Sequence, residues 1–141
     1  MLRYGFFKDF KGSDSLLIWG DAVALAELQS NLARLATGAA IRITLEAIEV
    51  ARGMPGVSVA FEVGQEELIV SYSVDATTII GRCSTERFAE FVAKLAGLVD
   101  QKCQSGHQYL DWPNLANVQV IVSKGEYPHD VGSTLSSGEH R

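Results

Sequence analysis

The sequence predicts a two-layer α+β domain, in which two helices cover one face of a mostly antiparallel sheet of about 5–7 strands. Two segments repeat apolar residues at steps of three and four, as amphipathic helices do, and most of the remaining chain alternates apolar and polar residues, as half-buried strands do. The chain has 141 residues, of which 47% are hydrophobic, which is enough for one core. Taken in order, the segments give ββαβββ(β)αβ, with the bracketed strand short.

The first predicted elements are a hairpin of residues 4–7 and 16–19, followed by a helix over residues 21–38. Asp21 can accept hydrogen bonds from the free N–H groups of the first helical turn, and Gly38 can adopt the left-handed conformation that ends a helix. The predicted buried face of this helix consists of four leucines: Leu25, Leu28, Leu32 and Leu35.

Alternating segments fill the middle of the chain. Residues 41–47 alternate, but the pattern changes phase after Ala47, so we expect a bulge or a bend there. Residues 57–63 and 68–74 flank a turn and predict a second hairpin. Residues 78–80 add a short strand before the second helix.

The second predicted helix begins after Ser84, which can cap it, and ends before residues 104–106. Its apolar stripe consists of Phe88, Phe91, Val92, Leu95, Leu98 and Val99. A final strand over residues 118–122 completes a single domain, residues 1–124. The remaining residues, 125–141, contain several glycines and serines and no sustained apolar pattern, so we expect a flexible tail.

The segments that precede the two helices resemble each other. SLLIWGD (residues 15–21) and TTIIGRC (residues 77–83) are both apolar runs that end in glycine and a polar residue. Two explanations stay open: a twofold-related pair of strand–helix units, or shared capping chemistry without a repeat.

Charge and composition exclude several classes of partner. Lys and Arg number 12 against 17 Asp and Glu, so the net charge is −5, and the chain lacks the basic footprint that a nucleic acid requires. No segment has the roughly 20 apolar residues that span a bilayer. Arg3, Lys8 and Asp9 interrupt any signal-peptide core, and two cysteines do not make a disulfide framework. We therefore expect a cytoplasmic protein with no membrane partner.

Three polar residues near the final strand are the candidate catalytic residues. In an extended segment His107, Tyr109 and Asp111 share one face, and Leu110 and Trp112 share the other. Such a trio can bind a polar ligand or move a proton, with His107 as general base, Asp111 orienting it and Tyr109 donating to a substrate. In the alternative interpretation the apolar pair anchors the segment, and the trio faces water or a neighbouring strand.

The candidate binding residues are Trp112, Glu126 and Tyr127, because the last two follow the final strand and can approach the same edge. No metal site is predicted: Cys83, Cys103, His107 and His129 lack paired ligand spacing. Cys83 precedes a helix, where a thiolate is stabilised, but Ala89 stands where a phosphatase loop needs arginine. Phosphate-loop and dinucleotide motifs are also absent from the sequence, so no cofactor is expected.

Two functional hypotheses follow. The first is a non-catalytic interaction module whose partner is another protein or a second copy of itself. Self-association would use the sheet face, because Ile69 and Ile121 are expected to point away from the helices. In size and acidity such a chain is similar to small bacterial interaction proteins, including immunity proteins that block toxins. The second is a small enzyme or small-ligand-binding protein that uses His107, Tyr109 and Asp111.

Overall fold

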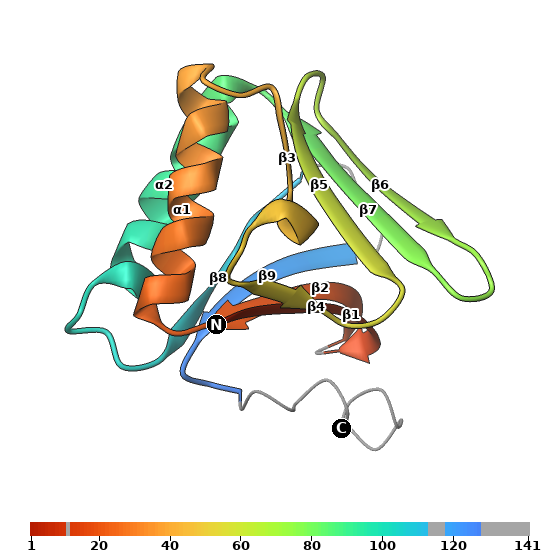
Figure 1. Cartoon of the computed structure of the whole chain (residues 1–141), viewed down its shortest axis with the longest axis horizontal. Helices are drawn as coiled ribbons and strands as arrows, with labels where there is room; N and C mark the ends of the chain where they lie inside the picture. Colours follow the sequence, from red (N-terminus) through yellow and green to blue (C-terminus); the bar gives the residue numbers. More distant parts are fainter. Residues whose placement is uncertain (11, 113–117, 128–141) are drawn as a thin grey trace.

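The structure is a computed structural model that describes residues 1–10, 12–112 and 118–127 (Figure 1). Within these residues the chain forms two helices and two β-sheets. The helices are α1 (Ala22–Thr37) and α2 (Thr85–Val99), and a 3-10 turn, η1, covers Leu45–Ala47. The strands are β1 (Leu2–Phe10), β2 (Ser13–Gly20), β3 (Arg42–Thr44), β4 (Ala51–Gly53), β5 (Val57–Val63), β6 (Glu67–Tyr72), β7 (Thr77–Cys83), β8 (Gly106–Tyr109) and β9 (Val118–Lys124).

The α+β class is confirmed, but the single, mostly antiparallel sheet is wrong. Sheet A has the strand order β4-β1-β2-β9-β8, and sheet B has the order β3-β5-β7-β6. Both sheets are mixed, because β1 and β4, β2 and β9, and β5 and β7 are parallel pairs. Alternation of apolar and polar residues reports that a strand has one buried face, and it carries no information about the direction of the neighbouring strand.

Strand pairing in the middle of the chain also differs from the prediction. β5 and β6 do not form a hairpin with each other, because β7 lies between them and pairs with both. The expected short strand at 78–80 is therefore a full central strand. The phase change after Ala47 marks η1 and the separate strand β4, not a bulge within one strand.

Both helices begin at the predicted caps, and α1 also ends at its predicted glycine, but α2 ends at Val99, earlier than the predicted end before residues 104–106. Asp21 Oδ1 accepts from the N–H of Ala24 at 2.9 Å, and Ser84 Oγ accepts from the N–H of Arg87 at 3.1 Å. Gly38 ends α1 with a φ of 82°. The C-terminal end of α2 receives the buried ammonium of Lys124, which donates to the carbonyl of Asp100 at 3.1 Å and to that of Cys103.

The main core lies between the two helices and the inner faces of both sheets. Figure 1 shows α1 and α2 side by side on the same side of sheet A, with sheet B closing the third side of the molecule. The placement of both helices on one face is thus confirmed. The buried face of α1 is as predicted, and in the predicted stripe of α2 the valines Val92 and Val99 are only partly buried. The fully buried residues are Leu25, Leu28, Leu32 and Leu35 from α1, and Phe88, Phe91, Leu95 and Leu98 from α2.

The two halves of the chain repeat one topology. In sheet A the order β1-β2-β9-β8 corresponds to β6-β7-β5-β3 in sheet B, with the same parallel and antiparallel neighbours. Registers match as well: Leu16 lies opposite Val120 in sheet A, and Ile79 lies opposite Val59 in sheet B. Apart from β4, each half is a ββαββ unit, and the two strands that follow its helix join the sheet of the other half. The similar segments before the two helices are therefore related strand–helix units.

The strand β4 has no counterpart in the second half of the described chain. None of the described helices is both long and apolar enough to cross a membrane. Most of the predicted flexible tail, residues 128–141, lies outside the described residues.

Candidate functional site

His107 lies at the edge of the outer face of sheet A, the face turned away from the helices. Its Nδ1 is 3.1 Å from Oε2 of Glu126, whose other oxygen accepts a hydrogen bond of 2.6 Å from Ser123 Oγ. His107 and Ser123 are direct partners across β8 and β9, so the strand pairing itself brings their side chains together. The ring of Tyr109 lies edge-on to the imidazole, with the ring centres 5.5 Å apart. We call His107, Ser123 and Glu126 the His107 cluster.

The predicted trio does not converge. Asp111 Oδ2 pairs with the Lys94 ammonium at 3.3 Å, and that ammonium also donates to the carbonyl of Tyr109 at 2.8 Å. The prediction that Asp111 orients His107 is wrong, because Glu126 occupies that place. The regular alternation that would have aligned the trio stops at Tyr109, where β8 ends.

The geometry of the His107 cluster limits its chemistry. Glu126 can hold the imidazole in one orientation, as carboxylates do in catalytic sites. However, the Ser123 hydroxyl donates to Glu126 or, at 3.3 Å, to the carbonyl of Gly106, and not to the imidazole, so the relation between a nucleophile and its base is not formed. The cluster is an oriented histidine without an activated nucleophile beside it.

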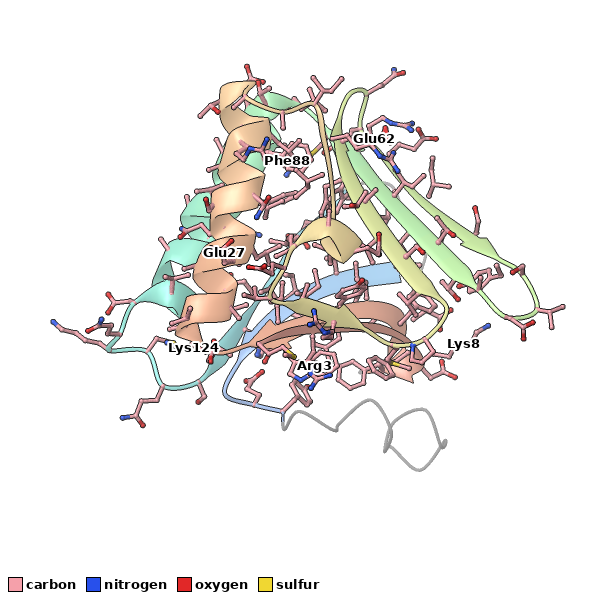
Figure 2. The ribbon with its side chains drawn as sticks, viewed as in Figure 1. Arg3, Lys8, Glu27, Glu62, Phe88 and Lys124 are labelled. Atoms are coloured by element: carbon pink, nitrogen blue, oxygen red, sulfur yellow. The ribbon has the colours of Figure 1, made fainter. Side chains whose placement is uncertain are left out.

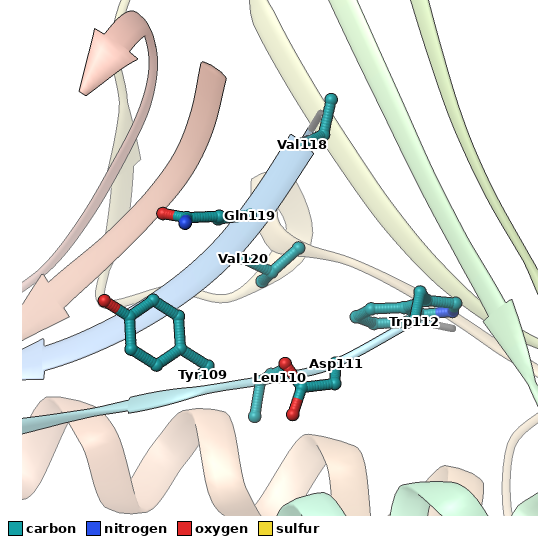
Figure 3. Close-up of a pocket in the computed structure, with 7 residues that line it drawn as sticks. All are labelled: Tyr109, Leu110, Asp111, Trp112, Val118, Gln119 and Val120. Carbon is teal, nitrogen blue, oxygen red and sulfur yellow. The ribbon is translucent and has the colours of Figure 1, made fainter. Parts of the chain in front are cut away.

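A shallow hollow of about 310 Å³ lies next to the end of β8. Tyr109, Asp111, Trp112 and Gln119 contribute to its lining, and His107 does not. Figure 3 shows Tyr109 and Trp112 on opposite sides of the intervening residues. The hollow therefore gathers two of the predicted catalytic side chains without the predicted base.

Trp112 belongs to the main core. Its ring packs on Phe91 and Phe61 at centre distances of 5.0 and 6.0 Å, and its indole N–H donates to the carbonyl of Arg82 at 3.0 Å. Gly81 permits this approach, since a Cβ there would lie 2.7 Å from the indole. These contacts show Trp112 as a packing residue, and the predicted binding role stays a prediction.

A second apolar cluster covers the outer face of sheet A. Ile121 points away from the helices as expected, but it is only 1% exposed. Tyr127 packs against this cluster, with its ring centre 5.9 Å from that of Phe10. The cluster consists of Phe7, Phe10, Leu17, Trp19 and Ile121. Because the chain already buries these side chains, the outer face of sheet A does not offer an open apolar surface.

The outer face of sheet B carries a row of alternating charges. Along one row of cross-strand partners, the guanidinium of Arg42 pairs with Glu62, and the guanidinium of Arg82 lies 3.1 Å from Glu62 and 2.6 Å from Glu67. Figure 2 labels Glu62 on this face. Ile69 lies on the same face opposite Ile80 and is half-buried. A row of ion pairs of this kind favours contact with water.

The edge of sheet B is the feature that the sequence did not indicate. β6 ends the order of sheet B, and no strand in the described ranges pairs with its outer side. Its equivalent in the other half, β1, is covered by β4. Tyr72 is 52% exposed, and its ring lies 5.8 Å from that of Phe6 and 4.9 Å from the ammonium of Lys8, both on β1. Val74, in the following turn, is 99% exposed. The low charge of its sequence, ELIVSY, is the one sequence feature that could have indicated an edge open to pairing. The predicted hairpin of residues 57–63 and 68–74 assigned this strand a neighbour that it does not have.

The cysteines do not form a reactive or metal-binding site. Cys83 is buried in the main core, and burial, assisted by the negative charge of Glu66, raises the pKa of its thiol to about 12. A thiolate at this helix start is therefore disfavoured. Among the described residues no three His, Cys, Asp or Glu side chains gather closely enough to hold a metal ion, and His129 lies outside those residues.

Comparison with known proteins adds no family: no protein-family model, curated protein or solved structure matches this chain.

Proposed function

We propose that this chain is a non-catalytic protein-interaction module that accepts an extended strand of a second polypeptide on the outer edge of β6. The observation that supports this proposal is the position of β6, a regular strand at the edge of sheet B with no described strand on its outer side. Edge strands of this kind are templates for pairing, and strand addition is a common mode of peptide recognition.

The backbone of β6 defines which groups are available. In an antiparallel pair, alternate residues direct both their N–H and their C=O toward the neighbour. The N–H of Ser73 donates to the carbonyl of Ala76 at 2.8 Å and closes the β6–β7 hairpin. Because this pattern repeats at every second residue, the backbone N–H and C=O groups of Ser71 and Ile69 also bond to β7. The groups that point outward therefore belong to the alternate residues: Leu68, Val70 and Tyr72.

The side chains of β6 favour a protein partner. Leu68 and Val70 are half-buried against the main core, so an added strand would extend an apolar surface that already exists. Glu67 is the one charged residue of the strand, and Arg82 already pairs with it. A charge that is paired within the chain does not repel an incoming strand, and natural edges that avoid pairing carry unpaired charges or proline.

The edge is a better candidate than either sheet face. The apolar residues on the outer face of sheet A are already buried, and the outer face of sheet B carries the row of ion pairs from Arg42 to Glu67. The alternative hypothesis, a small enzyme or small-ligand-binding protein, loses support because His107, Tyr109 and Asp111 do not converge.

A peptide array tests the proposal. The protein is first incubated with immobilised random nonapeptides to find those that bind. Added in solution, these peptides should protect the amides of Leu68, Val70 and Tyr72 from hydrogen exchange. The variant Val70→Pro removes an outward N–H without removing a bond to β7, so it should fold and lose binding at least tenfold. Val70→Thr keeps the N–H and the β-branched shape and serves as the control.

Two results would overturn the proposal. One is binding that leaves the exchange of the outward amides unchanged. The other is a folded Val70→Pro variant that binds the same peptides as well as Val70→Thr does. If Val70→Pro fails to fold, the exchange measurement on the unmodified protein still decides the question.

A further inference from the structure

We infer that the strand accepted by β6 is β6 of a second copy of this chain, paired antiparallel about a twofold axis that passes through Val70. This inference rests on the proposed function, since it names the partner of the same edge.

The outward backbone groups are self-complementary about Val70. In a twofold antiparallel pair, residues directly opposite each other must lie on the same face, so one residue must face its own counterpart. With Val70 on the axis, Leu68 lies opposite Tyr72 of the second copy, and every outward N–H and C=O of the strand finds a partner. With Ile69 on the axis, the facing groups would be those already bonded to β7.

The same register gives compatible side chains. On the core side, Val70 faces Val70 of the second copy, and Leu68 faces the half-exposed ring of Tyr72. On the outer side, Ile69 faces Ser71, and Glu67 faces Ser73. Apolar and aromatic pairs across strands are stabilising, whereas like charges directly opposite are destabilising, and none occur here.

The fold itself shows how an equivalent edge is closed. β1 corresponds to β6 in the internal repeat, and its outer edge is paired with β4 from Leu2 to Tyr4. In the described chain nothing plays the role of β4 beside β6. A second copy would supply this missing strand and join the two copies of sheet B into one continuous sheet.

The expected dimer is weak. Stable interfaces involve about 20–30 residues on each partner, and β6 offers only six, so we expect a dimer that dissociates on dilution. The copies should therefore exchange with monomer as concentration changes.

Sedimentation equilibrium between about 5 and 500 µM measures this association. We expect the mass to rise from 15.3 kDa toward twice that value. Over the same range, exchange of the Leu68, Val70 and Tyr72 amides should slow at least fivefold, while the Ile69 and Ser71 amides, bonded to β7, should not change. Val70→Pro should remain monomeric, and Val70→Thr should associate as the unmodified chain does.

A mass that stays at 15.3 kDa, or a dimer whose edge amides exchange as fast as in the monomer, would overturn the inference. Neither result would disprove the proposed function if array peptides still protect the edge of β6. Conversely, loss of peptide binding together with a monomeric mass would remove both.

Discussion

Cys83 is a residue whose burial decides its chemistry. Its side chain has no exposed surface, and burial raises the pKa of the thiol from 9.0 to about 12. At about pH 8, iodoacetamide should therefore modify Cys103, which is half-exposed, and leave Cys83 intact until the protein is denatured. Mass spectrometry of the folded and denatured protein would count one and two alkyl groups. Rapid modification of Cys83 in the folded protein would contradict the burial.

The raised pKa also gives a direction to the pH dependence of stability. Because the folded state holds the thiol protonated, its contribution is fully present below pH 9.0 and is lost as the pH rises toward about 12. A Cys83→Ala variant lacks this titration, so its free energy of unfolding should fall less steeply in that range.

Residue-scale prediction worked where chemistry is local and failed where it depends on the fold. Asp21, Ser84 and Gly38 were assigned correctly because a cap contacts its own helix. The partnership of His107 with Glu126 depends on the register of β8 and β9, and a sequence pattern contains no register. The proximity of Glu126 to this edge was predicted, but not its role in place of Asp111.

At the scale of elements, the helices were predictable because an apolar stripe identifies the buried face directly. Leu32 and Phe91 are at most 1% exposed and lie in the main core. Leu32→Ala or Phe91→Ala should each lower the free energy of unfolding by about 2–5 kcal/mol, measured by urea denaturation. Val23→Ala, on the exposed side of α1, is the matched control and should have little effect. A loss below about half a kcal/mol at either buried site would contradict the packing.

The strands were located better than they were paired. Alternation placed β5, β6 and β9 within a few residues, because one buried face produces that pattern whatever the neighbour. The neighbour itself is decided by loop paths and by the other half of the molecule. This is why the sequence predicted a hairpin of β5 with β6, and why the free edge of β6 was found only in the structure.

At the scale of the whole molecule, the internal repeat explains why the structure has two sheets where the sequence predicted one. Each half forms one hairpin of its own sheet and one helix, and its next two strands, with β4 left aside, pair in the other sheet. Sheet A therefore contains β8 and β9 from the second half, and sheet B contains β3 and β5 from the first. The two short segments that precede the helices hinted at this repeat, but strand exchange between halves leaves no signature in composition or periodicity.

Because each half contributes strands to the sheet of the other half, we expect neither half to fold alone. If the chain is cut in the turn between β5 and β6, at residues 64–66, neither sheet can be completed by one fragment alone, because each requires strands from both. Fragments 1–64 and 65–141 should each lack a cooperative thermal transition by circular dichroism. Mixed in equal amounts, they should recover one, since their shared core contains both helices. A fragment that unfolds cooperatively alone would show that its half is an independent unit, and the exchanged strands would then not be what holds the fold together.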